Sequence, residues 1–66
     1  PSQQYPYFED RILANRRGVQ KYGTQCFLQS GEVVLVPLID SLNVNKYRKE
    51  FGLETIEEYI KMLKSD

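Results

Sequence analysis

The sequence predicts one small α+β module with the element order α-β-β-α-α. A chain of 66 residues allows a single domain at most. Apolar residues recur at helical spacing in three segments, and at a spacing of two in the region between the first and second of these segments. A two-stranded hairpin needs other elements packed against it to be stable, so we expect the helices to cover it.

We interpret residues 1–6 as a polar lead-in and residues 7–66 as the module itself. Pro6 fits the first turn of a helix, because the N–H that proline lacks would have no partner there. A helix is predicted over residues 7–17, and Gly18 is expected to end it in the left-handed conformation. Three apolar residues share one face of this helix, which we expect to cover the core: Phe8, Ile12 and Leu13.

The next element is a predicted β-hairpin between residues 22 and 36, with Ser30-Gly31 as a two-residue turn. The facing pairs that follow from this turn are Gln29 with Glu32, Leu28 with Val33, Phe27 with Val34 and Cys26 with Leu35. The face that carries Leu28 and Cys26 is expected to cover the core. Burial would make Cys26 an inert thiol.

Two helices complete the predicted fold. Asp40 is expected to cap a short helix over residues 41–51, which ends at Gly52. Thr55 and Glu58 have the spacing of a capping box, which marks the start of the last helix. Its apolar stripe is Ile56, Tyr59, Ile60 and Leu63.

The side chains that most active sites need are scarce in this chain. It contains no histidine, and Cys26 is its one cysteine. Neither a histidine-activated nucleophile, nor a Cys/His zinc site, nor an internal disulfide can therefore be built within it. We expect no metal and no cofactor, we assign no catalytic residue, and whether the protein is an enzyme stays open.

A lone free thiol favours the cytoplasm, and no apolar run approaches the roughly 20 residues of a membrane span.

The carboxylates cluster in pairs that could in principle serve as general acid and base. Glu9-Asp10, Glu54 and Glu57-Glu58 all lie near the start of a predicted helix. Negative side chains there complement the positive end of the helix dipole. We therefore favour a structural interpretation of these acids.

The net charge is zero, but residues 11–21 contain four basic residues and no acidic one. These residues are Arg11, Arg16, Arg17 and Lys21. Basic side chains neutralise phosphates, and nearby tyrosines could stack on bases. Four charges are few, however, and the negative end of a helix dipole accounts for basic residues at this place. Nucleic acid is therefore not favoured as a partner.

The segment 18–25 reads Gly-Val-Gln-Lys-Tyr-Gly-Thr-Gln and is unusually polar for the entry to a strand. Its side chains could orient a ligand, with the planar guanidinium of Arg11 holding a carboxylate or phosphate. The candidate ligand-binding residues are Arg11, Gln20, Tyr22, Thr24 and Gln25. The alternative is that Gly23 permits a bulge or a close backbone approach, while Thr24 and Gln25 satisfy local backbone groups.

These residues also carry a resemblance. The chain resembles the C-terminal half of an uncharacterised bacterial domain family whose members carry an Asp-Arg-hydrophobic step and then Gly-x-x-Gln-x-Tyr-Gly-Thr-Gln. Here the two motifs are Asp10-Arg11-Ile12 and residues 18–25. The resemblance covers residues 7–63, with further matches at Pro37, Ile39-Asp40, Val44, Arg48, Gly52-Leu53 and Glu58-Tyr59. The resemblance implies a preceding helical half with a histidine and an aspartate close together, and it implies no particular activity.

Two classes of function follow from this sequence. The favoured hypothesis is a non-catalytic binding or assembly module. Its motive is the small core, which contributes only roughly 3–5 kcal/mol of net stability unless a partner adds more. Its partner would be the N-terminal half of a larger domain or another protein chain. The alternative is the C-terminal part of an enzyme, whose site would lie between that half and residues 18–25.

Overall fold

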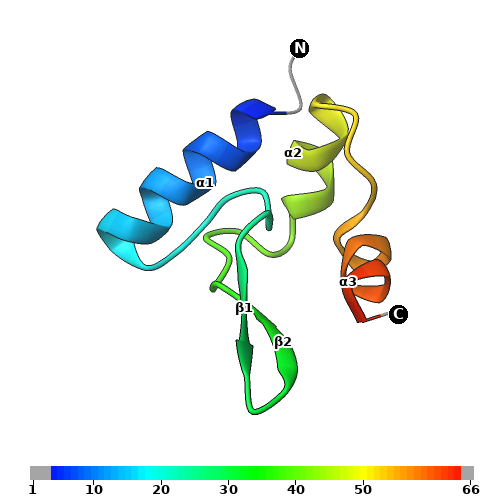
Figure 1. Cartoon of the computed structure of the whole chain (residues 1–66). Coiled ribbons are helices and arrows are strands. Elements are labelled where there is room, and N and C mark those ends of the chain that lie inside the picture. Colours follow the sequence, from blue (N-terminus) through cyan, green and yellow to red (C-terminus); the bar gives the residue numbers. More distant parts are fainter. Residues whose placement is uncertain (1–3, 65–66) are drawn as a thin grey trace.

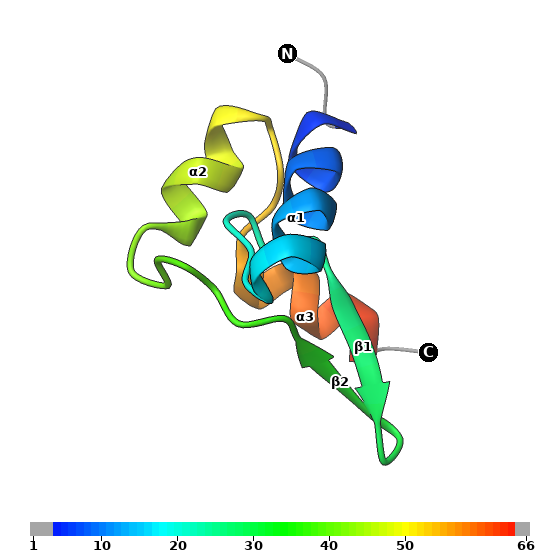
Figure 2. The ribbon, with the colours of Figure 1, turned by 90° about the vertical axis from the view of Figure 1, so that its left-hand side faces the viewer.

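The computed structural model describes residues 4–64 and confirms the α+β class and the order α-β-β-α-α. The elements are α1 (Gln4–Arg17), β1 (Cys26–Gln29), β2 (Glu32–Leu35), α2 (Val44–Glu50) and α3 (Ile56–Lys64). The helices lie around the segment that joins α1 to β1, and the tip of the hairpin extends away from all of them (Figure 1). A view from the side shows the same arrangement (Figure 2).

The hairpin has the predicted turn and register. Ser30 and Gly31 have φ angles of 53° and 80°, which is the left-handed pair that a type I′ turn requires. The strands pair antiparallel, with Gln29 opposite Glu32 and Cys26 opposite Leu35. A hydrogen bond of 3.1 Å from the Val36 N–H to the Gln25 carbonyl extends this ladder past the strands.

The predicted core face of the hairpin is wrong. Leu28 is 74% exposed, and the free thiol of Cys26 is exposed as well. The physical reason is the position of the hairpin: α3 packs against β2, whose residues 33–35 are half-buried, whereas every residue of β1 is exposed. The interpretation of Cys26 as a thiol made inert by burial is therefore wrong too.

Helix α1 differs from the prediction in its start and in its rotation. It begins at Gln4, so the described part of the predicted lead-in is helical. Its end is as predicted, because Gly18 has φ 70° and its N–H donates to the Ala14 carbonyl at 2.9 Å. The face expected to cover the core, however, points outward, with Phe8 61% exposed. Asp10, which lies beyond the first turn, is fully buried instead.

The start of α2 also differs from the prediction. Asp40 does not cap it, because residues 41–43 form a turn and the helix begins at Val44. The Asp40 carboxylate instead accepts hydrogen bonds of 2.9 Å from the Asn43 amide and from the Tyr47 hydroxyl. Both bonds lower the pKa of Asp40.

The capping box at the start of α3 is confirmed. The Glu58 N–H donates to the Thr55 hydroxyl at 3.2 Å, and the Thr55 N–H donates back to the Glu58 carboxylate at 3.3 Å. Between α2 and α3, Gly52 has φ 72°, which is the conformation expected of a residue that ends a helix. The buried residue of the α3 stripe is Ile56.

Among the described residues, the interior contains four buried polar or charged residues and three buried hydrophobic ones. Its apolar members are Tyr22, Val44 and Ile56, and the ring of Phe51 meets that of Tyr22 edge-on at 5.6 Å. Its polar members are Asp10, Gln20, Thr24 and Arg48. Charged side chains are almost never fully buried without partners. The partners of these four residues define the centre of the molecule.

Candidate functional site

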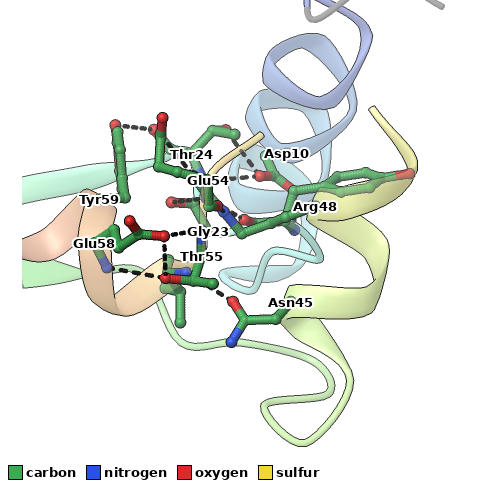
Figure 3. A network of polar contacts seen from close by, with 11 residues as sticks. Asp10, Gly23, Thr24, Asn45, Arg48, Glu54, Thr55, Glu58 and Tyr59 are labelled. Carbon is green, nitrogen blue, oxygen red and sulfur yellow. Dashed lines mark hydrogen bonds and ion pairs between the residues drawn. The ribbon is translucent and has the colours of Figure 1, made fainter. Parts of the chain in front are cut away.

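The buried polar groups meet at residues 20–25, here called the central loop. This loop contains most of the residues that the sequence singles out as candidates for binding a ligand. Figure 3 shows side chains from α1 and α2 converging on Gly23 and Thr24 of the loop.

The carboxylate of Asp10 binds the side of the central loop that faces α1. One oxygen accepts hydrogen bonds from the N–H groups of Lys21 at 2.8 Å and Tyr22 at 3.0 Å. The other accepts the Thr24 N–H at 3.0 Å and the Thr24 hydroxyl at 2.8 Å. Accepting four donors suits an ionised carboxylate, which has two oxygens and no proton to donate.

These bonds explain why α1 points Phe8 outward. Asp10 and Pro6 are four residues apart and are both buried, so they mark the inner face of the helix. Each hydrogen bond to a charged group contributes about 1.5–3 kcal/mol. Burying one apolar side chain such as Phe8 contributes about 1.5–3 kcal/mol in total. The set of bonds to Asp10 therefore outweighs the burial of one or two apolar residues and fixes the rotation of α1.

The guanidinium of Arg48 binds the opposite side of the loop. It donates to the carbonyl of Tyr22 at 2.8 Å and to that of Gly23 at 3.5 Å. It also donates to the backbone carbonyl of Glu54 at 2.5 Å and pairs with the Glu54 carboxylate at 3.3 Å. Its carbon lies 4.8 Å from the centre of the Tyr59 ring. The loop thus presents N–H groups to an anion on α1 and carbonyls to a cation on α2.

The side-chain amide of Gln20 ties the loop to the base of the hairpin. Its nitrogen donates to the carbonyls of Gln25 and Val36, both at 2.8 Å, and its oxygen accepts the Gln25 N–H at 2.8 Å. The backbone of Gln20 forms a parallel bridge with Leu38. The Gln20 side-chain amide therefore pairs with backbone N–H and C=O groups in the way that the backbone of a neighbouring strand would.

The ring of Tyr22 occupies the apolar part of the core and is 3% exposed. Burial raises the pKa of its hydroxyl well above the ordinary value, and the neighbouring Glu9 carboxylate raises this pKa further. The Tyr22 phenol therefore stays protonated at neutral pH and is unsuited to act as a general base. The ammonium of Lys21 lies over the Tyr22 and Tyr47 rings, at 5.3 Å and 4.7 Å from their centres.

Gly23 makes the close approach that the sequence predicts. Its φ angle is 77°, and a Cβ at this position would overlap the Cδ1 atom of Ile56. Ile56 is buried, so it has little room to move aside. Only glycine combines this conformation with this contact at low cost.

Replacing Gly23 with alanine is expected to lower the free energy of unfolding by about 2–4 kcal/mol, from the left-handed conformation and the steric overlap together. Gly18→Ala is a matched control, because Gly18 has φ 70° but open space where its Cβ would lie. It should cost only about 1 kcal/mol. Urea denaturation followed by far-UV circular dichroism measures both changes. Equal losses in the two variants would mean that the contact with Ile56 contributes nothing.

The structure brings most of the candidate ligand-binding residues together but separates one. Gln20, Tyr22 and Thr24 are buried and Gln25 is half-buried, all in the central loop. The Gln25 amide donates to the Thr24 hydroxyl at 3.1 Å. Arg11 is exposed on α1 and lies about 100° around the helix from Asp10, the neighbour that binds the loop. Ligand binding by these residues stays a prediction.

Two side chains that organise the loop, Asp10 and Arg48, are not predicted to do so from the sequence. The sequence predicts dipole complementation for Asp10, and Arg48 enters only through the family resemblance. A signal for Arg48 is its position four residues after Val44 and three before Phe51, on the apolar stripe of its helix. A charged residue in such a stripe indicates a buried ion with partners.

Two further findings concern residues 4–64 as a whole. Within this part of the chain, no group of three potential metal-ligating side chains comes together at one point. The helices described there are too short and too polar to span a bilayer.

Comparison with known proteins gives one result. A family model described as "Family of unknown function (DUF6624)" matches residues 1–66. No curated protein and no solved structure matches the chain.

Proposed function

Since the chain belongs to DUF6624, a family of unknown function, we propose its role from its structure: it is a non-catalytic binding or assembly module. The observation that carries this proposal is that charged side chains are buried while large apolar side chains are exposed to solvent. Asp10 and Arg48 are at most 1% exposed, whereas Phe8, Leu28 and Leu42 are 61%, 74% and 93% exposed. Large apolar side chains gathered into an exposed patch mark a surface that another chain covers, and the number of such side chains exposed on so small a module supports a surface of this kind here.

The energies support the same proposal. Burying one exposed apolar side chain contributes about 1.5–3 kcal/mol. The net stability of a domain of this size is roughly 3–5 kcal/mol. Covering two of the exposed residues would therefore add about as much stability as the whole domain has alone. The partner that we propose is a preceding helical half of a larger domain or another protein chain.

We also propose that the protein works in the cytoplasm. Cys26 is free and exposed, and exposed thiols persist in reducing compartments. The enzyme alternative receives no comparable support. The Gln20 amide, the Tyr22 N–H and the Thr24 hydroxyl donate hydrogen bonds to other groups of the protein rather than facing a ligand. Arg11 lies on a different side of α1 from Asp10.

The test is sedimentation velocity of the chain over a range of concentrations, together with fluorescence of the dye 8-anilinonaphthalene-1-sulfonate (ANS), which binds exposed apolar surface. We expect a mass that rises with concentration and a clear ANS signal. Leu28→Ser combined with Leu42→Ser should reduce both, because it removes two exposed apolar side chains. A compact monomer that melts cooperatively and binds no ANS would contradict the proposal.

A further inference from the structure

We infer that the outer face of α1 binds an amphipathic helix whose apolar stripe is flanked by aspartate or glutamate. This face comprises the exposed residues Phe8, Arg11, Ile12, Asn15 and Arg16. The inference rests on the proposed function and adds the chemistry of the partner. Figure 1 shows α1 at the edge of the molecule.

The apolar residues of the outer face cannot turn inward. Phe8 and Ile12 are four residues apart and are 61% and 55% exposed. Rotating α1 to bury them would withdraw the Asp10 carboxylate from its four donors in the central loop. The stripe is therefore a fixed feature of the surface, held rigid from the inside of the helix.

The arrangement of charge on this face selects the partner. At about 100° per residue, Arg11 lies on one side of the Phe8–Ile12 stripe and Arg16 on the other. Within residues 4–64, neither arginine forms an ion pair. A groove beside the stripe can receive the ridges of a second helix. It is lined by Glu9, Ile12, Leu13, Arg16 and Arg17, so its two guanidinium groups outnumber its one carboxylate.

A helix with an apolar stripe between two rows of carboxylates complements this pattern of charge. Two arginines are fewer than the roughly four to eight basic residues of clusters that bind anionic lipid. They would also neutralise too few phosphates for stable binding to nucleic acid. The geometry therefore favours an acidic helix over either of these polyanions.

The experiment measures the fluorescence anisotropy of two labelled helical peptides that are titrated with the 66-residue chain. Both carry a leucine stripe, which is flanked by glutamate in one peptide and by lysine in the other. We expect saturable binding of the glutamate peptide, at least roughly tenfold tighter than that of the lysine peptide. This difference should shrink at high salt, because added ions screen the charges.

Variants locate the binding on the outer face. Phe8→Ser and Ile12→Ser are each expected to weaken binding of the glutamate peptide roughly tenfold. Arg11→Gln with Arg16→Gln should remove the preference for glutamate over lysine. The matched controls are Met62→Ser, which truncates an apolar side chain of α3 that is 57% exposed, and Lys46→Gln, which neutralises an exposed charge on α2. Neither control should change binding. Circular dichroism verifies that each variant keeps its helices.

Four outcomes would overturn the inference: equal binding of the two peptides, no binding at millimolar peptide, an effect of Met62→Ser as large as that of Phe8→Ser, or tighter binding to phosphatidylserine vesicles or single-stranded DNA. If the chain still associates and binds ANS while neither peptide binds, the outer face is not the site and the proposed function stands. A compact monomer that binds neither ANS nor peptide would overturn both.

Discussion

Asp10→Ala is expected to unfold most of the chain at room temperature. The substitution leaves the N–H groups of Tyr22 and Thr24 buried without an acceptor, and it removes the bonds to Lys21 N–H and to the Thr24 hydroxyl. Each buried unsatisfied group costs about 1–3 kcal/mol, so the total loss is about 3–5 kcal/mol. That equals the whole stability of roughly 3–5 kcal/mol expected of a domain this size.

Asp10→Asn provides a graded version of the same test. The amide keeps the shape and one acceptor oxygen, but its NH₂ group must then face at least one N–H donor of the loop. We expect an intermediate loss. Glu32→Gln is the matched control, because it makes the same chemical change at an exposed position, and it should stay within about 0.5 kcal/mol of the original chain. Urea denaturation measures all three, and a fully folded Asp10→Ala variant would contradict the role of Asp10.

Arg48→Met is the second substitution with a large expected effect. Methionine fills much of the same space, but the carbonyls of Tyr22 and Glu54 lose their donor. Removing one member of a buried charged network typically costs about 3–5 kcal/mol. Arg48→Lys should rescue only part of this loss, because one ammonium lacks the planar fork that reaches both carbonyls.

The control for Arg48 is its neighbour Lys49, which is exposed on the same helix. Lys49→Met should change the free energy of unfolding by at most about 0.5 kcal/mol. Thermal and urea denaturation of the three variants compare these effects directly. If Arg48→Lys is as stable as the original chain, the bonds from the guanidinium do not hold the loop.

The elements predicted correctly are those that local chemistry determines. The hairpin register follows from the Ser30-Gly31 turn, because a two-residue loop fixes which residues face each other. The start of α3 follows from Thr55 and Glu58, whose bonds lie within a single turn. Each of these signals lies within a few residues of the feature that it specifies.

The rotation of α1 could not be predicted in the same way. The pattern of Phe8, Ile12 and Leu13 indicates an inward apolar face, and it is overruled by bonds from Asp10 to residues as far as 14 positions along the chain. Arg48 is a stronger case, because its bond to Tyr22 spans 26 positions. Such contacts exist only once the fold has formed, so no local pattern contains them.

The position of the central loop follows in part from the sequence, whereas ligand binding by its residues stays a prediction. The sequence identified the central loop through Gln20, Tyr22, Thr24 and Gln25, and the structure places all four together. The structural alternative is right for Gly23, which makes the close approach. It is wrong for Thr24 and Gln25, because the Thr24 hydroxyl donates to Asp10 and the Gln25 amide donates to Thr24, whereas Asp10 and Gln20 accept the backbone N–H groups of the segment.

The polar interior also determines how the stability of the chain depends on temperature. Exposing apolar surface on unfolding raises the heat capacity, whereas exposing polar surface lowers it. Much of the surface that this interior would expose on unfolding belongs to polar residues: Asp10, Gln20, Thr24 and Arg48. Its heat-capacity change on unfolding should therefore be small for its length. A small change flattens the curve of free energy against temperature, so the chain should lose little of its modest stability on cooling.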